Sequence, residues 1–175
     1  MLIIIASFIF SGDGMEMKDE REFVRLLFLQ QQVMEFAAKH WNQDAIIVSK
    51  KDHLLYYCRY GRIVKNEYWG GNVYNFPVKV SLASKYYRTP EGEFRVEIKN
   101  DQSQYIKFLG FKGLYGIHSA ATRLASFLDK MEKQDPGFTF VTKKDDTRGC
   151  VAVENRVIQY LYAMVDVNTP VLIVP

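Results

Sequence analysis

Two short stretches, Tyr115-Gly116-Ile117-His118-Ser119 and Thr147-Arg148-Gly149-Cys150-Val151, hold one histidine and one cysteine. Cysteine acyl chemistry needs a thiolate, a base that generates it, and amide N–H groups that stabilise an oxyanion. Cys150 is the candidate nucleophile and His118 the candidate base, because such pairs meet in the folded protein rather than along the chain. Since Gly149 leaves the backbone open on one side, its amide and that of Cys150 can face a substrate carbonyl.

Taken alone, His118 and Cys150 also fit purely structural roles. Buried structural cysteines are common, and a histidine after an apolar strand is often a core residue. The second cysteine, Cys58, lies in a strand pattern, and the sequence leaves open whether it forms a disulfide with Cys150. Two cysteines and three histidines make no ligand cluster at metal spacing, so we expect no metal. No phosphate-binding loop or dinucleotide fingerprint is present, and we expect no cofactor.

Composition indicates a globular protein. The 175 residues suit one domain with an appended segment, and 48% of them are hydrophobic, including 11 Tyr and 12 Phe. The net charge of +3 is far too small to indicate nucleic-acid binding.

The first ten residues form an apolar run that is too short to span a bilayer, followed by Ser11-Gly12. This resembles the core and cleavage region of a secretory signal, although the basic segment that should precede it is missing. The alternatives are a start site further upstream, a poor signal and a short buried strand. We expect residues 1–14 to be an export signal and the protein to act in the periplasm or cell envelope.

Apolar residues recur at helical spacing from Met17 to Trp41, which predicts an N-terminal helix within residues 15–43. Strand patterns follow, interrupted by two further helices. We expect strands at Ala45–Lys50, Leu54–Arg59, Arg62–Trp69, Pro77–Leu82, Phe94–Ile98, Tyr105–Phe111, Leu114–His118 and Val171–Val174, and helices at Ala120–Lys133 and Asn155–Val165.

Many short strands with few helices, and no βαβ alternation, predict a mainly β fold: a sandwich or barrel-like arrangement of mixed sheets with attached helices, over residues 44–175. Turns join the strands. Pro90 and Gly92 preset a tight turn before Phe94, and His53 is expected to be exposed at the turn after Lys51-Asp52.

The order of these pieces resembles the L,D-transpeptidase catalytic domain, a family of bacterial cell-wall enzymes. The resemblance covers about residues 45–174. It is carried by the opening hairpin, by Arg88-Thr89-Pro90-Glu91-Gly92-Glu93-Phe94, by Ile117-His118-Ser119, by Thr147-Arg148-Gly149-Cys150-Val151 and by the ending Val167-Asn168-Thr169-Pro170-Val171-Leu172-Ile173.

The chain departs from the family pattern in three places. Thirty-one residues separate His118 from Cys150, about twice the usual gap, which suggests an inserted helix beside the cleft. Arg148 replaces a frequent histidine, and Ala152 stands where arginine or asparagine is usual. These positions put the choice of substrate in doubt more than the chemistry.

The resemblance implies attack by Cys150 on a peptidoglycan stem peptide, with His118 as general base and acid. It also implies that the Ser119 backbone orients His118 and that the Gly149 amide contributes to an oxyanion hole. Arg148, Tyr115 and Thr147 are the candidate substrate-binding residues. A hydrolase acting on the same polymer is the main alternative, and an inactive wall-binding module or a cytosolic thiol protein are further ones.

Overall fold

The computed structural model describes residues 20–65, 75–78, 80, 88–119, 126–127, 130–131, 133–134 and 147–175. Several expected features therefore lie wholly or partly outside the described residues. They are the export signal at 1–14, the first residues of the N-terminal helix, half of each strand expected at Arg62–Trp69 and Pro77–Leu82, and most of the helix expected at Ala120–Lys133.

The described strands form two mixed sheets, as the sequence predicts. The larger has the order β3-β2-β1-β10-β5, with β4 also paired to β2, and β10 runs parallel to β1. Its strands are β1 (Asp44–Ser49), β2 (Leu54–Arg59), β3 (Arg62–Ile63), β4 (Phe76–Pro77), β5 (Gly92–Arg95) and β10 (Pro170–Val174). The smaller has the order β6-β7-β8-β9. Its strands are β6 (Ile98–Asn100), β7 (Phe108–Lys112), β8 (Tyr115–His118) and β9 (Val151–Ala152).

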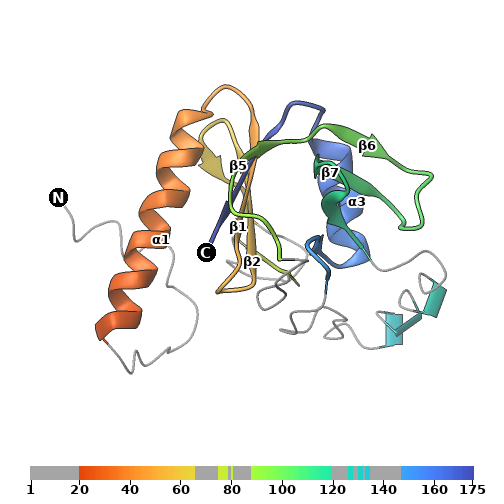
Figure 1. The fold of residues 1–175 in the computed structure, drawn as a ribbon, viewed down its shortest axis with the longest axis horizontal. Helices are drawn as coiled ribbons and strands as arrows, with labels where there is room; N and C mark the ends of the chain where they lie inside the picture. Colours follow the sequence, from red (N-terminus) through yellow and green to blue (C-terminus); the bar gives the residue numbers. More distant parts are fainter. Residues whose placement is uncertain are drawn as a thin grey trace.

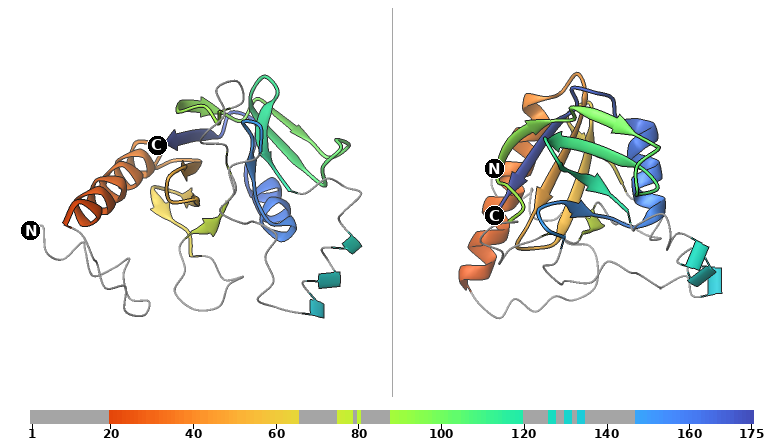
Figure 2. Two further views of the ribbon diagram at one scale, coloured as in Figure 1. Left: turned by 60° about the horizontal axis from the view of Figure 1, so that its bottom comes forward. Right: turned by 45° about the vertical axis from the view of Figure 1, so that its right-hand side comes forward.

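The larger sheet is buried on both faces, because alternate residues of a strand point to opposite sides. One face packs against the smaller sheet and against α3 (Asn155–Met164), and the other against α1 (Glu20–Lys39). In β1, Ile46 and Val48 belong to the first core, whereas Ala45 and Ile47 belong to the second. The two helices accordingly lie on opposite sides of the strands (Figure 1; Figure 2).

The chain changes sheet between Arg95 and Ile98, where the sequence predicts one strand from Phe94 to Ile98. β5 pairs with β10 in the larger sheet, and β6 pairs with β7 in the smaller. At the crossover the Val96 amide donates to the Thr169 carbonyl at 2.8 Å and the Glu97 amide to the Gly110 carbonyl at 2.7 Å. Successive amides therefore bond to different sheets, and this links the two layers.

Three smaller expectations were wrong. The strand expected at Tyr105–Phe111 begins at Phe108, and β3 ends at Ile63. His53 is buried rather than exposed, with a φ of 55°. Its carbonyl accepts the Val78 amide at 2.9 Å, so the turn is covered by a neighbouring segment.

Within the described part of the chain, none of the helices combines the length and the apolar character needed to cross a lipid bilayer.

Candidate active site

The smaller sheet places His118 at the end of β8 and Cys150 directly before β9, the neighbouring strand. β8 and β9 run parallel, with Ile117 opposite Val151 and His118 opposite Ala152. Because Ile117 and Val151 point into the core, the residues that alternate with them, His118 and Cys150, lie on the other face of the sheet. The two residues, far apart in sequence, thus share one face.

The imidazole of His118 has a defined tautomer. Its Nδ1 atom lies 2.6 Å from the carbonyl oxygen of Ser119. A carbonyl can only accept a hydrogen bond, so Nδ1 carries the proton and Nε2 presents a lone pair. Among the described residues, the buried Nε2 atom has no hydrogen-bond partner. Burial lowers the pKa of His118, and the bond to Ser119 opposes that effect.

The loop before Cys150 requires a glycine. Gly149 has a φ of 103°, and a Cβ at this position would lie 2.5 Å from the ring of Tyr115. Only glycine combines this backbone conformation with such a close approach. The Cys150 amide donates to the Thr147 carbonyl over a long 3.4 Å, which closes the turn only weakly.

Two threonine hydroxyls converge on the carbonyl of Cys150. Thr147 Oγ1 donates to it at 2.6 Å and Thr89 Oγ1 at 3.2 Å. The hydroxyl of Thr147 therefore bonds within its own loop, although the residue also lines a hollow beside Cys150 that is described below. Thr89 lies in the predicted turn before β5, but the sequence pattern did not reveal its hydrogen bond to the Cys150 carbonyl.

The thiol of Cys150 is largely buried and forms no disulfide. Its Sγ atom lies 3.9 Å from the Leu114 carbonyl. Burial raises the pKa of this thiol, partly offset by a hydrogen bond with the Gly116 backbone. Cys58 is also a free buried cysteine, so no disulfide joins the two. With the thiol pKa raised and the imidazole pKa lowered, both groups are uncharged at rest near neutral pH.

A hollow of ≈ 520 Å³ opens beside Cys150. Its other lining residues are Gln104, Tyr105, Leu114, Tyr115, Thr147 and Arg148. Of these, Tyr115, Thr147 and Arg148 are sequence-predicted substrate-binding residues, and Arg148 is exposed with a left-handed φ of 53°.

Tyr105 is the main site residue that the sequence did not indicate. Its ring stacks on the imidazole of His118 with centroids 3.6 Å apart and an interplanar angle of 17°. Burial raises the pKa of the Tyr105 hydroxyl, and the charge of a Cys150 thiolate would raise it further. Tyr105 therefore contacts both the imidazole of His118, which is 7% exposed, and the hollow beside Cys150.

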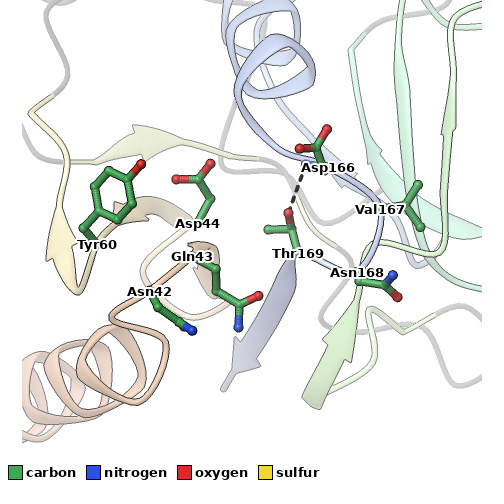
Figure 3. Close-up of a pocket in the computed structure, with 8 residues that line it drawn as sticks. All are labelled: Asn42, Gln43, Asp44, Tyr60, Asp166, Val167, Asn168 and Thr169. Carbon is green, nitrogen blue, oxygen red and sulfur yellow. Dashed lines mark hydrogen bonds between the residues drawn. The ribbon is translucent and has the colours of Figure 1, made fainter.

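A second hollow of ≈ 310 Å³ lies at the start of β1 (Figure 3). It is lined by Asn42, Gln43, Asp44, Tyr60, Asp166, Val167, Asn168 and Thr169. Thr169 Oγ1 accepts the Asp166 amide there at 3.1 Å. Its described lining holds neither a cysteine nor a histidine, so the hollow beside Cys150 is the candidate active site.

Comparison with known proteins identifies the family. The family model of the L,D-transpeptidase catalytic domain (YkuD) matches residues 43–173. No curated protein matches the sequence. Solved structures with the same fold include three L,D-transpeptidases. The one from Xylanimonas cellulosilytica is 17% identical with a TM-score of 0.55, over 76% of this chain and 61% of that chain.

The enzyme from Stackebrandtia nassauensis is 15% identical with a TM-score of 0.56, over 76% and 56% of the two chains. L,D-transpeptidase 3 from Mycobacterium tuberculosis, solved with a faropenem-derived adduct, is 14% identical with a TM-score of 0.55, over 75% and 60%. This chain thus spans less than two thirds of the length of each. The family match spans about three quarters of the sequence, and solved members have the same fold. The chain therefore belongs to the L,D-transpeptidase catalytic-domain family.

Proposed function

We propose that this protein is a cysteine acyltransferase that acts on peptidoglycan stem peptides. The observation that best supports the proposal is the hydrogen bond from His118 Nδ1 to the Ser119 carbonyl. This bond leaves Nε2 as an unprotonated base on the sheet face that also carries Cys150.

In the first step, Cys150 Sγ attacks the carbonyl carbon of the amide before the terminal D-alanine. His118 Nε2 takes the thiol proton as the S–C bond forms, because a thiol with a raised pKa is a poor nucleophile without a base. The Gly149 amide stabilises the oxyanion, and the Cys150 amide joins it by exchanging its long bond to the Thr147 carbonyl for one to the oxyanion. Each such donor contributes about 3 kcal/mol. The imidazolium then gives its proton to the leaving amine, the C–N bond breaks, and D-alanine departs.

In the second step, the thioester is resolved by a nucleophile. An amine of a neighbouring stem gives a cross-link, whereas water gives a shortened stem and makes the protein an L,D-carboxypeptidase or related hydrolase. His118 Nε2 accepts the proton of either nucleophile, and the thiol leaves. Both reactions share one acyl-enzyme.

The residues that line the hollow suggest how a peptide is held. The Arg148 guanidinium is exposed, forms no ion pair within the described part of the chain, and suits a substrate carboxylate. The half-buried ring of Tyr115 offers an apolar wall, and Thr147 stabilises the loop beneath the peptide.

The proposed substrate lies outside the cytoplasmic membrane, so this function requires export. We infer that the protein acts in the periplasm or cell envelope. Fractionation of the producing cells is expected to recover it outside the cytoplasm, and recovery in the cytosol alone would contradict the proposal.

The function is tested by incubating the protein with purified tetrapeptide muropeptides and measuring product masses. Cross-linked dimers indicate transpeptidation, and tripeptides without dimers indicate hydrolysis. Cys150→Ala is expected to abolish both. Cys58→Ala is the matched control, because it removes a buried thiol that lies under α1 rather than beside the hollow.

The nucleophile is tested separately with faropenem, since L,D-transpeptidase 3 from Mycobacterium tuberculosis has been solved with an adduct of this compound. We expect a mass increase on the Cys150 peptide in wild type and in Cys58→Ala. An unmodified Cys150 in folded wild-type protein, together with no muropeptide product, would reject the enzyme proposal.

A further inference from the structure

Lys50 has an unusual environment for a lysine. It follows β1 directly, and its side chain is completely buried. Its ammonium donates to the Thr89 carbonyl at 2.8 Å and to Glu91 Oε1 at 2.7 Å. Burying an ammonium is costly unless it is paired and hydrogen-bonded, and Glu91, with a side chain 37% exposed, supplies the compensating charge.

Thr89 connects this lysine to the nucleophile. The carbonyl of Thr89 accepts from Lys50, and its hydroxyl donates to the carbonyl of Cys150 at 3.2 Å. Thr89 itself is completely buried, so water does not compete for either bond. A continuous path of hydrogen bonds therefore runs from the Glu91 carboxylate through Lys50 and Thr89 to the backbone of Cys150.

We propose that Lys50 is a positioning residue for the nucleophile: its ammonium fixes Thr89, and Thr89 fixes the peptide plane that follows Cys150. The inference rests on the proposed function and adds to it a residue that does not line the hollow. The bond is charge-assisted and directional, which an apolar side chain of equal size could not reproduce.

The conformation of the loop that carries Cys150 explains why the position of the thiol needs support. The Cys150 loop holds a left-handed arginine and a glycine at a φ of 103°, and its internal Thr147–Cys150 backbone bond is long. Within the loop, the Thr147 hydroxyl donates to the Cys150 carbonyl at 2.6 Å. Thr89 adds a bond to the same carbonyl from outside the loop, at 3.2 Å, and this bond ties the loop to the turn before β5. A displacement of the thiol by about 1 Å is enough to reduce catalysis by about 100-fold.

The test is the double variant Lys50→Met/Glu91→Gln, which removes both charges and leaves neither one unpaired. Single-turnover acylation by faropenem then separates the maximal rate constant from the half-saturating concentration. We expect the rate constant to fall by at least about tenfold with the half-saturating concentration unchanged, since a misplaced nucleophile affects the chemical step. Lys99→Met is the matched control, because Lys99 also donates to a backbone carbonyl, that of Val165, at 2.6 Å.

Thr89→Val and Thr89→Ser provide a second route that does not depend on the folding of the Lys50 variant. Thr89→Val is expected to lower the same rate constant, and Thr89→Ser, which keeps the hydroxyl, to restore it. The effects of Thr89→Val and the Lys50 double variant should not be additive, because both interrupt one path. A folded Lys50 double variant or Thr89→Val that acylates at the wild-type rate overturns the proposal, as does an equal loss in Lys99→Met.

Failure of the proposed function would be visible separately. If wild type reacts neither with faropenem nor with tetrapeptide, the pH profile of Cys150 alkylation by iodoacetamide still reports its alignment with His118. Lys50→Met/Glu91→Gln is then expected to lose the acidic inflection due to His118, whereas Lys99→Met retains it. An unchanged inflection in the double variant refutes the positioning role even in that case.

Discussion

At the scale of single residues, the site depends on a base that is kept neutral. Burial lowers the pKa of His118 from 6.5, and a protonated imidazole cannot accept the thiol proton. The rate of Cys150 acylation should therefore stay high as pH falls to 6.5 and decline only below that value. A pH series of faropenem acylation rates measures this, and His118→Gln should remove the inflection. An inflection centred above 6.5 would contradict the assignment.

Gly149 is a second residue whose identity the geometry constrains. Gly149→Ala places a Cβ at 2.5 Å from the Tyr115 ring at a φ of 103°, so the loop must move. We expect the acylation rate constant to fall by about 100-fold, the typical cost of losing an oxyanion donor.

Gly113→Ala is the control for Gly149→Ala. Gly113 also has a positive φ, of 55°, but an added Cβ meets nothing within 4 Å. It is expected to cost about 1 kcal/mol of stability and to leave acylation near the wild-type rate. Equal losses of activity in the two variants would mean that backbone strain alone, not the position of the Gly149 amide, explains the effect.

At the scale of elements, the sequence predicted the strands and helices whose apolar residues form a continuous run or recur at helical spacing. The structure has β1, β2, β8, β10, α3 and the two mixed sheets, all of which were predicted. The segments β1 and β10 are continuous apolar runs because both faces of the larger sheet are buried, whereas α3 shows helical spacing. The switch from β5 to β6 was not, because Val96 and Glu97 continue an extended backbone and only their partners change. β9 is two residues long, too short to show a period.

The candidate site was likewise predicted only in part from the sequence. The sequence patterns indicated His118, Cys150 and Gly149, because each residue type is required by its chemistry or backbone conformation. Tyr105 gave no signal, since an aromatic residue after a polar turn has the same pattern whether it packs in a core or stacks on a histidine. The buried Lys50 was assigned to a strand end, where a lysine is ordinarily exposed.

The pairing of β7 with β8 determines where His118 lies, and Gly116 permits their close approach. A Cβ on Gly116 would lie 2.5 Å from the Phe108 ring and 2.7 Å from the Leu109 carbonyl oxygen. The ring can rotate, but the carbonyl belongs to the paired strand. Gly116→Ala should therefore destabilise the protein by about 1–3 kcal/mol in urea unfolding, and should slow acylation. Leu114→Ala, in the same hairpin at 92% exposure, should change the stability little.

At the scale of the whole molecule, α1 packs on the catalytic fold although the family match begins only at residue 43. Leu29, Val33, Phe36 and Ala37 share a core with the outer face of the larger sheet. Two ion pairs flank this core, Arg25 with Asp52 and Lys39 with Glu93. Because these partners border the turns that contain Lys50 and Glu91, α1 supports the elements that hold the proposed positioning path.

This arrangement makes a prediction that two phenylalanines of one helix can test. Phe36 is 5% exposed against the sheet, whereas Phe28 is 61% exposed on the far side of α1. Phe36→Ala should lower the free energy of unfolding by about 3–5 kcal/mol, and Phe28→Ala by no more than about 0.5 kcal/mol. Cys58 is buried beneath α1 in the same cluster, so the reactivity of its thiol measures independently whether α1 has loosened from the sheet. A thiol reagent should label it faster in Phe36→Ala than in wild type, because loosening of the helix exposes it before global unfolding. If Phe36→Ala is as stable as Phe28→Ala and Cys58 stays protected, α1 is not part of the cooperative unit.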